Sequence, residues 1–279
     1  MKKSKLKENL KYVLIFLVGL AVAMYPVISR LYYRIEANSE VHDFDTNAKK
    51  MDKKEIDRRI RLAQIYNKTL NPSKLADPYS EKEKKNAISE YARMLEVKEK
   101  IGHVEIPKIN QDLPIYAGTS EEVLQKGVGH LEGTSLPVGG KSTHTVLTAH
   151  RGLPTAKLFT DLNKMKKGDV FFIHNIKEVL AYKVIDIFVV EPSDFDKVLV
   201  VEGKDYCTLL TCTPYMINSH RLLVRAERTE YNPAAVEKDL VSQVTGKYKI
   251  YLIISLIIIA ILLWYYIRQR RRKKNNEIK

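Results

Sequence analysis

Two cysteines lie close together in the run Asp205-Tyr-Cys-Thr-Leu-Leu-Thr-Cys212. The Thr, Leu and Tyr residues of this run predict a strand. Cys207 and Cys212 would lie about 17 Å apart along that strand, and their odd spacing sends the two side chains to opposite faces. A disulfide needs Cα atoms within about 7 Å of each other. The two thiols therefore cannot pair, and at least one of them is a candidate nucleophile.

Cys212 is the better candidate, because it ends the predicted strand and is followed by the turn-forming pair Thr213-Pro214. The alternative is that the cysteines are buried and act only as small hydrophobic side chains. That interpretation suits Cys207 better than Cys212.

Catalysis by a thiol also needs a proton carrier and a group that stabilises an oxyanion. His150 follows the predicted strand 143–149, where a strand gives way to a loop, and His220 is the alternative proton carrier. Arg221 opens the strand after the next loop, and a loop between consecutive antiparallel strands would place it beside Cys212. Its forked, permanent charge suits a carbonyl oxygen that gains negative charge.

Other kinds of site find little support in the sequence. His144 and His150 share a strand face, but no cysteine pair or third spaced ligand accompanies them, so we expect no metal site. There is no glycine-rich phosphate loop, and we expect no cofactor. The lysines of residues 81–100 fit a solvated helix face better than a nucleic-acid surface. A single His or Arg is more often structural than catalytic, so spacing alone leaves thiol catalysis a hypothesis.

The elements that must position these residues are mainly strands. Short β-branched runs separated by Gly and Pro follow residue 100. The predicted strands are 101–106, 113–116, 143–149, 169–174, 179–190, 205–212 and 221–227. Short strands with few long helices predict a small β-barrel rather than a parallel α/β sheet.

Before the strands, the sequence predicts two helices. Residues 39–70 show an apolar stripe of helical period and end at Asn71-Pro72-Ser73. A loop at 74–80 contains Asp77-Pro78-Tyr79, and the capping box at 80–83 begins a second helix.

The charge is concentrated at the two ends of the chain. Of the formal net charge of +14, residues 1–11 supply +4 and residues 268–279 supply +6. A hydrophobic content of 45% is too high for a disordered chain. The basic residues therefore belong to the ends and do not form a nucleic-acid-binding face.

Two uncharged stretches of 18 residues, 12–29 and 250–267, lie beside these basic ends. As helices they would be about 27 Å long, close to the thickness of the bilayer hydrocarbon core. Their basic flanks predict a hairpin of two spans with both tips in the cytoplasm and residues 30–247 outside. The alternative for the first stretch is a signal peptide that is cleaved after Ala21-Val22-Ala23.

The run Thr208-Leu209-Leu210-Thr211-Cys212 resembles the Thr-Leu-x-Thr-Cys motif of sortases. Thr148-Ala-His150-Arg-Gly resembles their His-bearing strand end, and Arg221 lies at the position of their essential arginine. The resemblance covers roughly residues 100–230. It implies a mainly β fold, a closed eight-stranded barrel. It also implies that Cys212 is the nucleophile, His150 the general acid/base and Arg221 the oxyanion stabiliser.

Within that family the chain resembles the pilus-assembling class C. That class has helices before the barrel, a second membrane span and a lid loop with Asp-Pro-aromatic, which corresponds to Asp77, Pro78 and Tyr79. The class more often has Trp or Phe at the last position. The resemblance implies that Tyr79 covers Cys212 and that Asp77 pairs with Arg221. An ordinary proline turn is the alternative to a lid.

The resemblance implies cleavage of a Leu-Pro-x-Thr-Gly (LPxTG) sorting signal between Thr and Gly through a thioester. The acyl group is then joined to a lysine of another pilin subunit. Pilins and other surface proteins would be the substrates. The protein itself would be in contact with the membrane. Two alternatives are an anchoring sortase that uses a cell-wall precursor and a non-enzymatic two-span scaffold.

The sequence thus divides into six expected parts. They are an anchor or signal peptide (1–30), a helical segment with the lid loop (31–99), the catalytic barrel (100–230), a linker (231–247), a membrane helix (248–267) and a basic cytoplasmic tail (268–279).

Overall fold

The computed structural model describes residues 2–70, 94–232 and 264. The chain forms two compact units, Met1–Tyr231 and Asn232–Lys279. The lid loop, nearly all of the helix expected after residue 80, the linker beyond residue 232 and the basic tail lie outside the described residues. The same holds for the second span except Trp264, which is helical.

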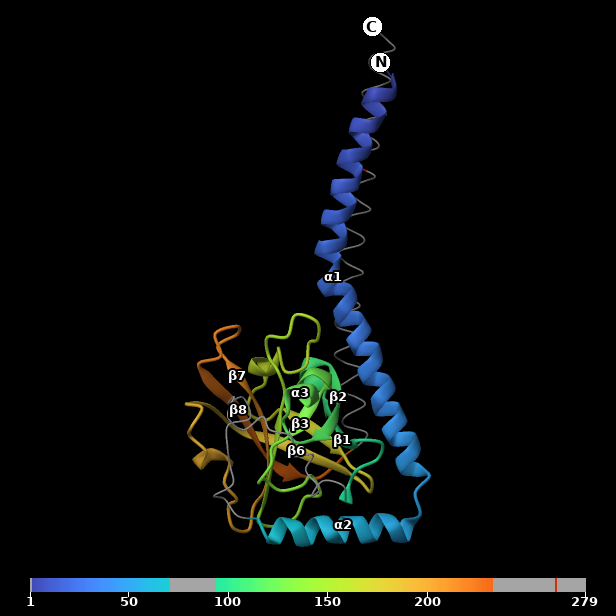
Figure 1. Cartoon of the computed structure of the whole chain (residues 1–279). Coiled ribbons are helices and arrows are strands. Elements are labelled where there is room, and N and C mark those ends of the chain that lie inside the picture. Colours follow the sequence, from blue (N-terminus) through green and yellow to red (C-terminus); the bar gives the residue numbers. More distant parts are fainter. Residues whose placement is uncertain (1, 71–93, 233–263, 265–279) are drawn as a thin grey trace. The chain divides into compact units, whose positions relative to one another are not determined.

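Two long helices precede the strands (Figure 1). α1 (Lys2–Lys49) is continuous through Pro26, and α2 is Lys53–Lys68. The prediction of a single helix over 39–70 is wrong. The backbone of Asp52 is extended, and its carboxylate accepts a hydrogen bond of 3.0 Å from the Lys54 amide, so Asp52 caps a new helix.

Eight strands form a closed barrel, which confirms the predicted fold class. The strands are β1 (Lys100–Ile106), β2 (Gln111–Ala117), β3 (Val128–His130), β4 (Thr143–Thr148), β5 (Val170–His174), β6 (Val179–Val190), β7 (Asp205–Thr213) and β8 (His220–Thr229). Their order around the barrel is β1-β2-β3-β4-β7-β8-β6-β5. The pairs β2–β3 and β4–β7 are parallel, and the other neighbouring strands are antiparallel.

The sequence analysis did not predict β3 or the short helix α3 (Glu121–Lys126) before it. Three short 3-10 helices lie in other connections: η3 (Pro107–Ile109), η4 (Leu162–Lys164) and η5 (Asp196–Val198). β3 has only three residues, and a Cβ at Gly129 would lie 2.5 Å from the Gly118 carbonyl oxygen. Three residues are too few to show the alternation that predicts a strand. The pairing of β3 depends instead on this close backbone approach.

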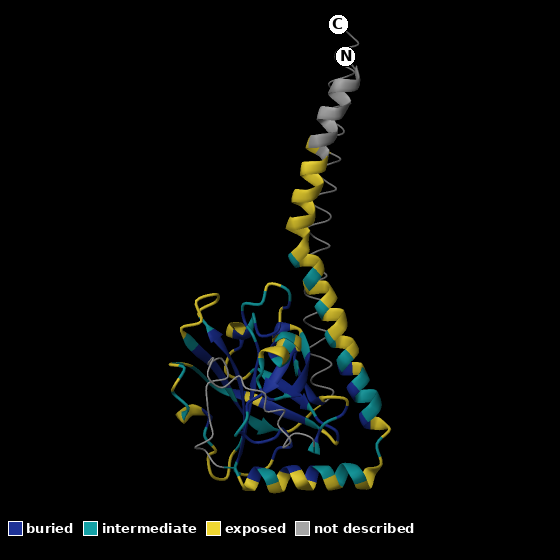
Figure 2. Ribbon diagram, in the orientation of Figure 1, coloured by how far each residue is buried: buried dark blue, intermediate teal, exposed yellow. Residues whose placement is uncertain are grey.

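The barrel encloses a hydrophobic core that extends to both long helices (Figure 2). Phe44 of α1 and Ala63 of α2 are almost completely buried in it. From Leu14 to Ile28, in contrast, α1 exposes its apolar side chains. Within the described residues, α1 is the one helix with a segment, Leu14–Lys49, long and apolar enough to cross a membrane.

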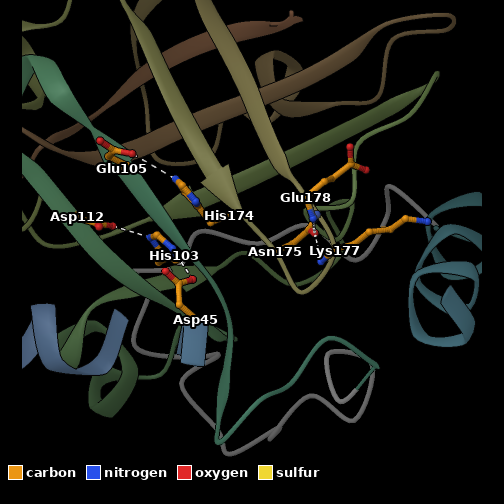
Figure 3. A network of polar contacts seen from close by, with 8 residues as sticks. All are labelled: Asp45, His103, Glu105, Asp112, His174, Asn175, Lys177 and Glu178. Carbon is orange, nitrogen blue, oxygen red and sulfur yellow. Dashed lines mark hydrogen bonds and ion pairs between the residues drawn. The ribbon is translucent and has the colours of Figure 1, made fainter. Parts of the chain in front are cut away.

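A polar network also joins α1 to the barrel (Figure 3). The ring of His103 in β1 lies 2.7 Å from Asp112 of β2 through Nδ1 and 3.3 Å from Asp45 of α1 through Nε2. It stacks on His174 with ring centroids 4.1 Å apart. Burial lowers the pKa of His103, but the two carboxylates outweigh burial, and the pKa is raised. The raised pKa favours the charged form of His103, which helps to hold α1 against the barrel through Asp45.

Candidate active site

Cys212 and Arg221 lie directly opposite each other in the antiparallel pair β7–β8. Residues opposite each other in such a pair have Cα atoms about 4.5–5.5 Å apart. The loop of residues 214–219, named here the rim loop, joins the two strands. Both side chains are 7% exposed, so both groups are largely screened from bulk water. The predicted proximity of the two residues is confirmed.

His150 reaches the same level from the other side of β7. β4 and β7 run parallel, with Thr148 opposite Leu210. The pairing continues beyond β4, because the Ala149 amide donates to the Leu210 carbonyl at 3.3 Å. Two residues beyond the Thr148–Leu210 pair, His150 comes level with Cys212. Cys212 and Arg221 thus belong to β7 and β8, and His150 follows the end of the neighbouring strand β4.

The threonines of the sequence motif support this arrangement. Thr211 Oγ1 donates to the Ala149 carbonyl at 2.7 Å, immediately before His150. Thr208 Oγ1 lies 2.8 Å from Nε2 of the buried His144, and Leu209 is fully buried in the core. The motif residues before Cys212 therefore tie β7 to β4 and to the core.

The guanidinium of Arg221 is fixed by the backbone of the rim loop. Its Nη1 donates to the carbonyl oxygens of Asn218 at 3.0 Å and His220 at 3.1 Å. These bonds use one end of the fork, and a guanidinium carries five N–H donors in fixed directions. The charge is therefore held in place beside Cys212.

Glu121 and Arg151 belong to the same region, and the sequence analysis missed both. Glu121 Oε1 lies 3.3 Å from Nε2 of His150. Arg151 Nη1 donates to Thr213 Oγ1 at 2.6 Å, which connects the loop after β4 to the end of β7. Ser120 followed by two glutamates is a recognisable helix start and was the available signal for α3.

The thiol of Cys207 has a different environment from that of Cys212. Neither cysteine forms a disulfide, which confirms that they do not pair. Cys207 is fully buried, and burial, assisted by the nearby Asp205, raises the pKa of its thiol well above the usual value. A neutral thiol in the core fits the structural role that its position suggested.

His220, the alternative proton carrier, and the buried His144 are engaged elsewhere. His220 is adjacent to Arg221 in β8, so its side chain points to the opposite face, where Nε2 lies 3.1 Å from Glu191. Both ring nitrogens of His144 have partners, since Nδ1 lies 2.9 Å from the Leu199 carbonyl and Nε2 contacts Thr208. Burial lowers the pKa of His144 to about 4. Neither position suits a proton carrier for Cys212.

No three His, Cys, Asp or Glu side chains gather into a possible metal site in the part of the chain that the structure describes. The predicted lid residues Asp77, Pro78 and Tyr79 lie outside the described residues.

Comparison with known proteins matches residues 104–229 to the sortase domain. The chain is 60% identical to sortase C-1 from Streptococcus pneumoniae, over 70% of this chain and 100% of that structure, with a TM-score of 0.68. It is 61% identical to a pilus-related sortase C of Group B Streptococcus, over 68% of this chain and 97% of that structure, with a TM-score of 0.66.

Among curated proteins, Sortase A of Bacillus anthracis is 32% identical over 135 residues, and the match spans 61% of its length. Sortase D of Bacillus subtilis is 31% identical over 114 residues, which span 54% of its length. The chain thus matches little more than half of each of these relatives.

With its closed barrel and its match to nearly complete sortase structures, the chain belongs to the sortase family. The pilus-related sortase C structures among its matches confirm the resemblance to class C.

Proposed function

We propose that the protein is a membrane-anchored class C sortase, a cysteine transpeptidase that polymerises pilins. The observation that carries this proposal is the meeting of Cys212, His150 and Arg221 at one level of three neighbouring strands. Pilus-related proteins among the structural matches favour pilins as substrates.

In the first step, the Cys212 thiolate attacks the threonine carbonyl carbon of an LPxTG-type sorting signal. The carbonyl oxygen becomes an oxyanion, which the guanidinium of Arg221 stabilises. The bond from carbon to the glycine nitrogen then breaks, and the His150 imidazolium donates its proton to that leaving nitrogen. The product is a thioester between the sorting signal and Cys212.

In the second step, a lysine amine of another pilin attacks the thioester carbonyl carbon. His150, now neutral, accepts the proton that the amine loses. The carbon–sulfur bond breaks, the thiolate of Cys212 is restored, and an isopeptide bond joins the two subunits. Glu121, whose Oε1 lies 3.3 Å from Nε2 of His150, helps to orient the imidazole.

The membrane arrangement is part of the proposal. The exposed apolar half of α1 forms one anchor, and residues 250–267 form the second. Basic residues at both tips favour cytoplasmic ends and an extracellular barrel. Substrates with membrane anchors of their own would then diffuse in the same plane, which raises their effective concentration near the enzyme.

A lid formed by Asp77, Pro78 and Tyr79 is also proposed, on the support of the sequence resemblance. Replacing Asp77 and Tyr79 together by alanine should make Cys212 react faster with a thiol reagent. The matched measurement is the Cys212→Ala chain, which should take up almost no reagent because Cys207 is buried. An unchanged labelling rate in the double variant would argue against the lid.

The decisive test is mass spectrometry of the full chain in detergent, mixed with a sorting-signal peptide and a lysine-bearing pilin fragment. We expect a thioester on Cys212, followed by an isopeptide product. Transfer to a cell-wall precursor amine in preference to lysine would identify an anchoring sortase instead. Absence of the thioester would favour the non-enzymatic scaffold.

A further inference from the structure

We propose that the rim loop, residues 214–219, rests on the lipid surface of the membrane that α1 crosses. The inference relies on the α1 anchor proposed above and is independent of the chemistry at Cys212. It concerns three consecutive apolar side chains that α1 and the loop after β4 hold at the membrane surface.

The rim loop exposes large apolar side chains at the catalytic end of the barrel. Tyr215, Met216 and Ile217 are 44%, 63% and 71% exposed. Three such neighbours in water are unfavourable unless a partner covers them, because each would gain from burial. Their position directly after β7 places the uncovered apolar surface beside Cys212.

A chain of contacts links this loop to α1. Residues 151–160 form the loop after β4, named here the histidine loop, which closes where the Phe159 amide donates to the His150 carbonyl at 3.1 Å. Ser29 Oγ of α1 donates to the Thr155 carbonyl of the histidine loop at 3.4 Å. The histidine loop therefore lies against α1 at residue 29.

The rim loop packs against the same histidine loop. A Cβ added at Gly152 would lie only 3.2 Å from Met216 Sδ, so the two loops are in contact. Figure 1 shows both loops at the end of the barrel from which the N-terminal half of α1 projects. The three apolar side chains are thus held near the level of Ser29.

Ser29 marks the outer limit of the hydrocarbon layer. It is the last residue of the uncharged stretch 12–29, and Arg30 and Arg34 follow it. Tyr32, at the same level, is exposed. Aromatic and basic residues at the end of an apolar helix mark the membrane–water interface. The headgroup layer beyond the hydrocarbon is only about 5–7 Å thick on each side.

A lipid surface therefore fits the rim loop better than a protein partner. Its apolar side chains include a tyrosine, whose apolar ring and polar hydroxyl suit the boundary between headgroups and acyl chains. The loop has no acidic residue that anionic lipids would repel. Given the proposed function, Cys212 would open close to the membrane, where the sorting signal of an anchored substrate lies near its own span.

Lipid contact can be measured by tryptophan fluorescence in the full chain. The native Trp264 is first replaced by phenylalanine, and Ile217→Trp is introduced as the reporter. Leu20→Trp in the exposed apolar part of α1 reports on the span, and Val201→Trp is the matched control. Val201 is also exposed and apolar, but it precedes β7 and so lies at the other end of that strand from Cys212.

Each variant is reconstituted into phosphatidylcholine and phosphatidylglycerol vesicles that contain lipids brominated at shallow or deep positions. We expect shallow bromines to quench the Ile217→Trp reporter, with a blue-shifted emission. Deep bromines should quench Leu20→Trp most strongly, and neither lipid should quench Val201→Trp.

Four outcomes would overturn the proposal. If Leu20→Trp is quenched and Ile217→Trp is not, the anchor stands and the lipid contact of the rim loop fails. Equal quenching of Ile217→Trp and Val201→Trp would mean that the barrel has no preferred face toward the membrane. Emission of Ile217→Trp that responds to a sorting peptide and not to lipid would make the rim loop a substrate surface. If Leu20→Trp is not quenched, the α1 anchor fails together with this inference.

Discussion

Replacing Arg221 by lysine tests the proposed mechanism most directly. The change keeps the positive charge and removes the fork. In the native protein one end of the fork donates to the carbonyls of Asn218 and His220 at 3.0 and 3.1 Å. The fork also carries further N–H donors in fixed directions, and in the proposed mechanism these stabilise the oxyanion of the acyl group on Cys212. A lysine ammonium has three donors at one point, so it cannot hold the same carbonyls and also reach the oxyanion.

The size of the effect follows from the role of the missing donor. Loss of one preorganised oxyanion donor costs about 2.7–4 kcal/mol, which lowers kcat about 10²–10³-fold. KM should change little, because the oxyanion exists in the transition state and not in the bound substrate. The partly buried backbone carbonyls would lose part of their hydrogen bonding, and the stability should fall by only about 1 kcal/mol.

The assay is cleavage of a fluorescence-quenched sorting peptide by the full chain in detergent, with single-turnover acylation of Cys212 followed by mass spectrometry. Arg225→Lys is the matched control on the same strand. Arg225 pairs with Asp186 at 2.7 Å, and a lysine can keep that ion pair. The control variant should stay within about threefold of the native kcat.

A native kcat in Arg221→Lys would refute the assignment of Arg221 to the oxyanion. A loss confined to KM would show instead that Arg221 binds the ground state of the peptide. If Arg225→Lys loses as much activity as Arg221→Lys, the effect reflects a disturbed strand and not the proposed chemistry.

Three further predictions concern the two thiols, the contact between Glu121 and His150, and the link between α1 and the barrel. Cys212→Ala should abolish thioester formation in mass spectra, whereas Cys207→Ser should retain transfer activity and lose about 1–3 kcal/mol of unfolding free energy in denaturant titrations; the opposite pattern would exchange the roles of the two thiols. Glu121→Gln should lower kcat by at most about fivefold, because a half-exposed ion pair is worth about 0.2–1 kcal/mol; a hundredfold loss would give Glu121 a direct catalytic role. The raised pKa of His103 means that its ion pair with Asp112 stabilises the fold fully below the unfolded pKa of about 6.5 and is lost as the pH rises through the folded pKa. His103→Gln should therefore destabilise the protein more at pH 6 than at pH 9 in thermal unfolding, and a pH-independent difference would contradict a charged His103.

Local patterns in the sequence were sufficient for much of the barrel. Seven strands carry enough β-branched and alternating residues to be recognised, and all seven are present in the structure. β3 was missed because three residues hold too little pattern. The break between α1 and α2 was missed because the apolar periodicity continues across Asp52. In the structure Asp52 caps the start of α2 and so separates the two helices.

The candidate site, too, was only partly predictable from the sequence. Cys212 and Arg221 belong to consecutive strands, so a short hairpin makes them neighbours and the sequence predicts the pairing. His150 meets Cys212 through a parallel pairing of strands that about 60 residues separate. The resemblance to sortases named His150, but no spacing in the chain indicates that β4 lies beside β7.

The amino-acid sequence by itself determined that the two thiols do not pair with each other, and it determined the hairpin that joins Cys212 to Arg221, the barrel strands and the apolar stretch of α1. These features depend on side-chain period and on neighbours in the chain. Only the tertiary structure decided that Glu121 approaches His150, that His103 lies between two carboxylates that raise its pKa, and that the rim loop contacts the histidine loop, which is hydrogen-bonded to α1. Each of these depends on contacts between distant segments, which form when the barrel closes and the helices pack against it.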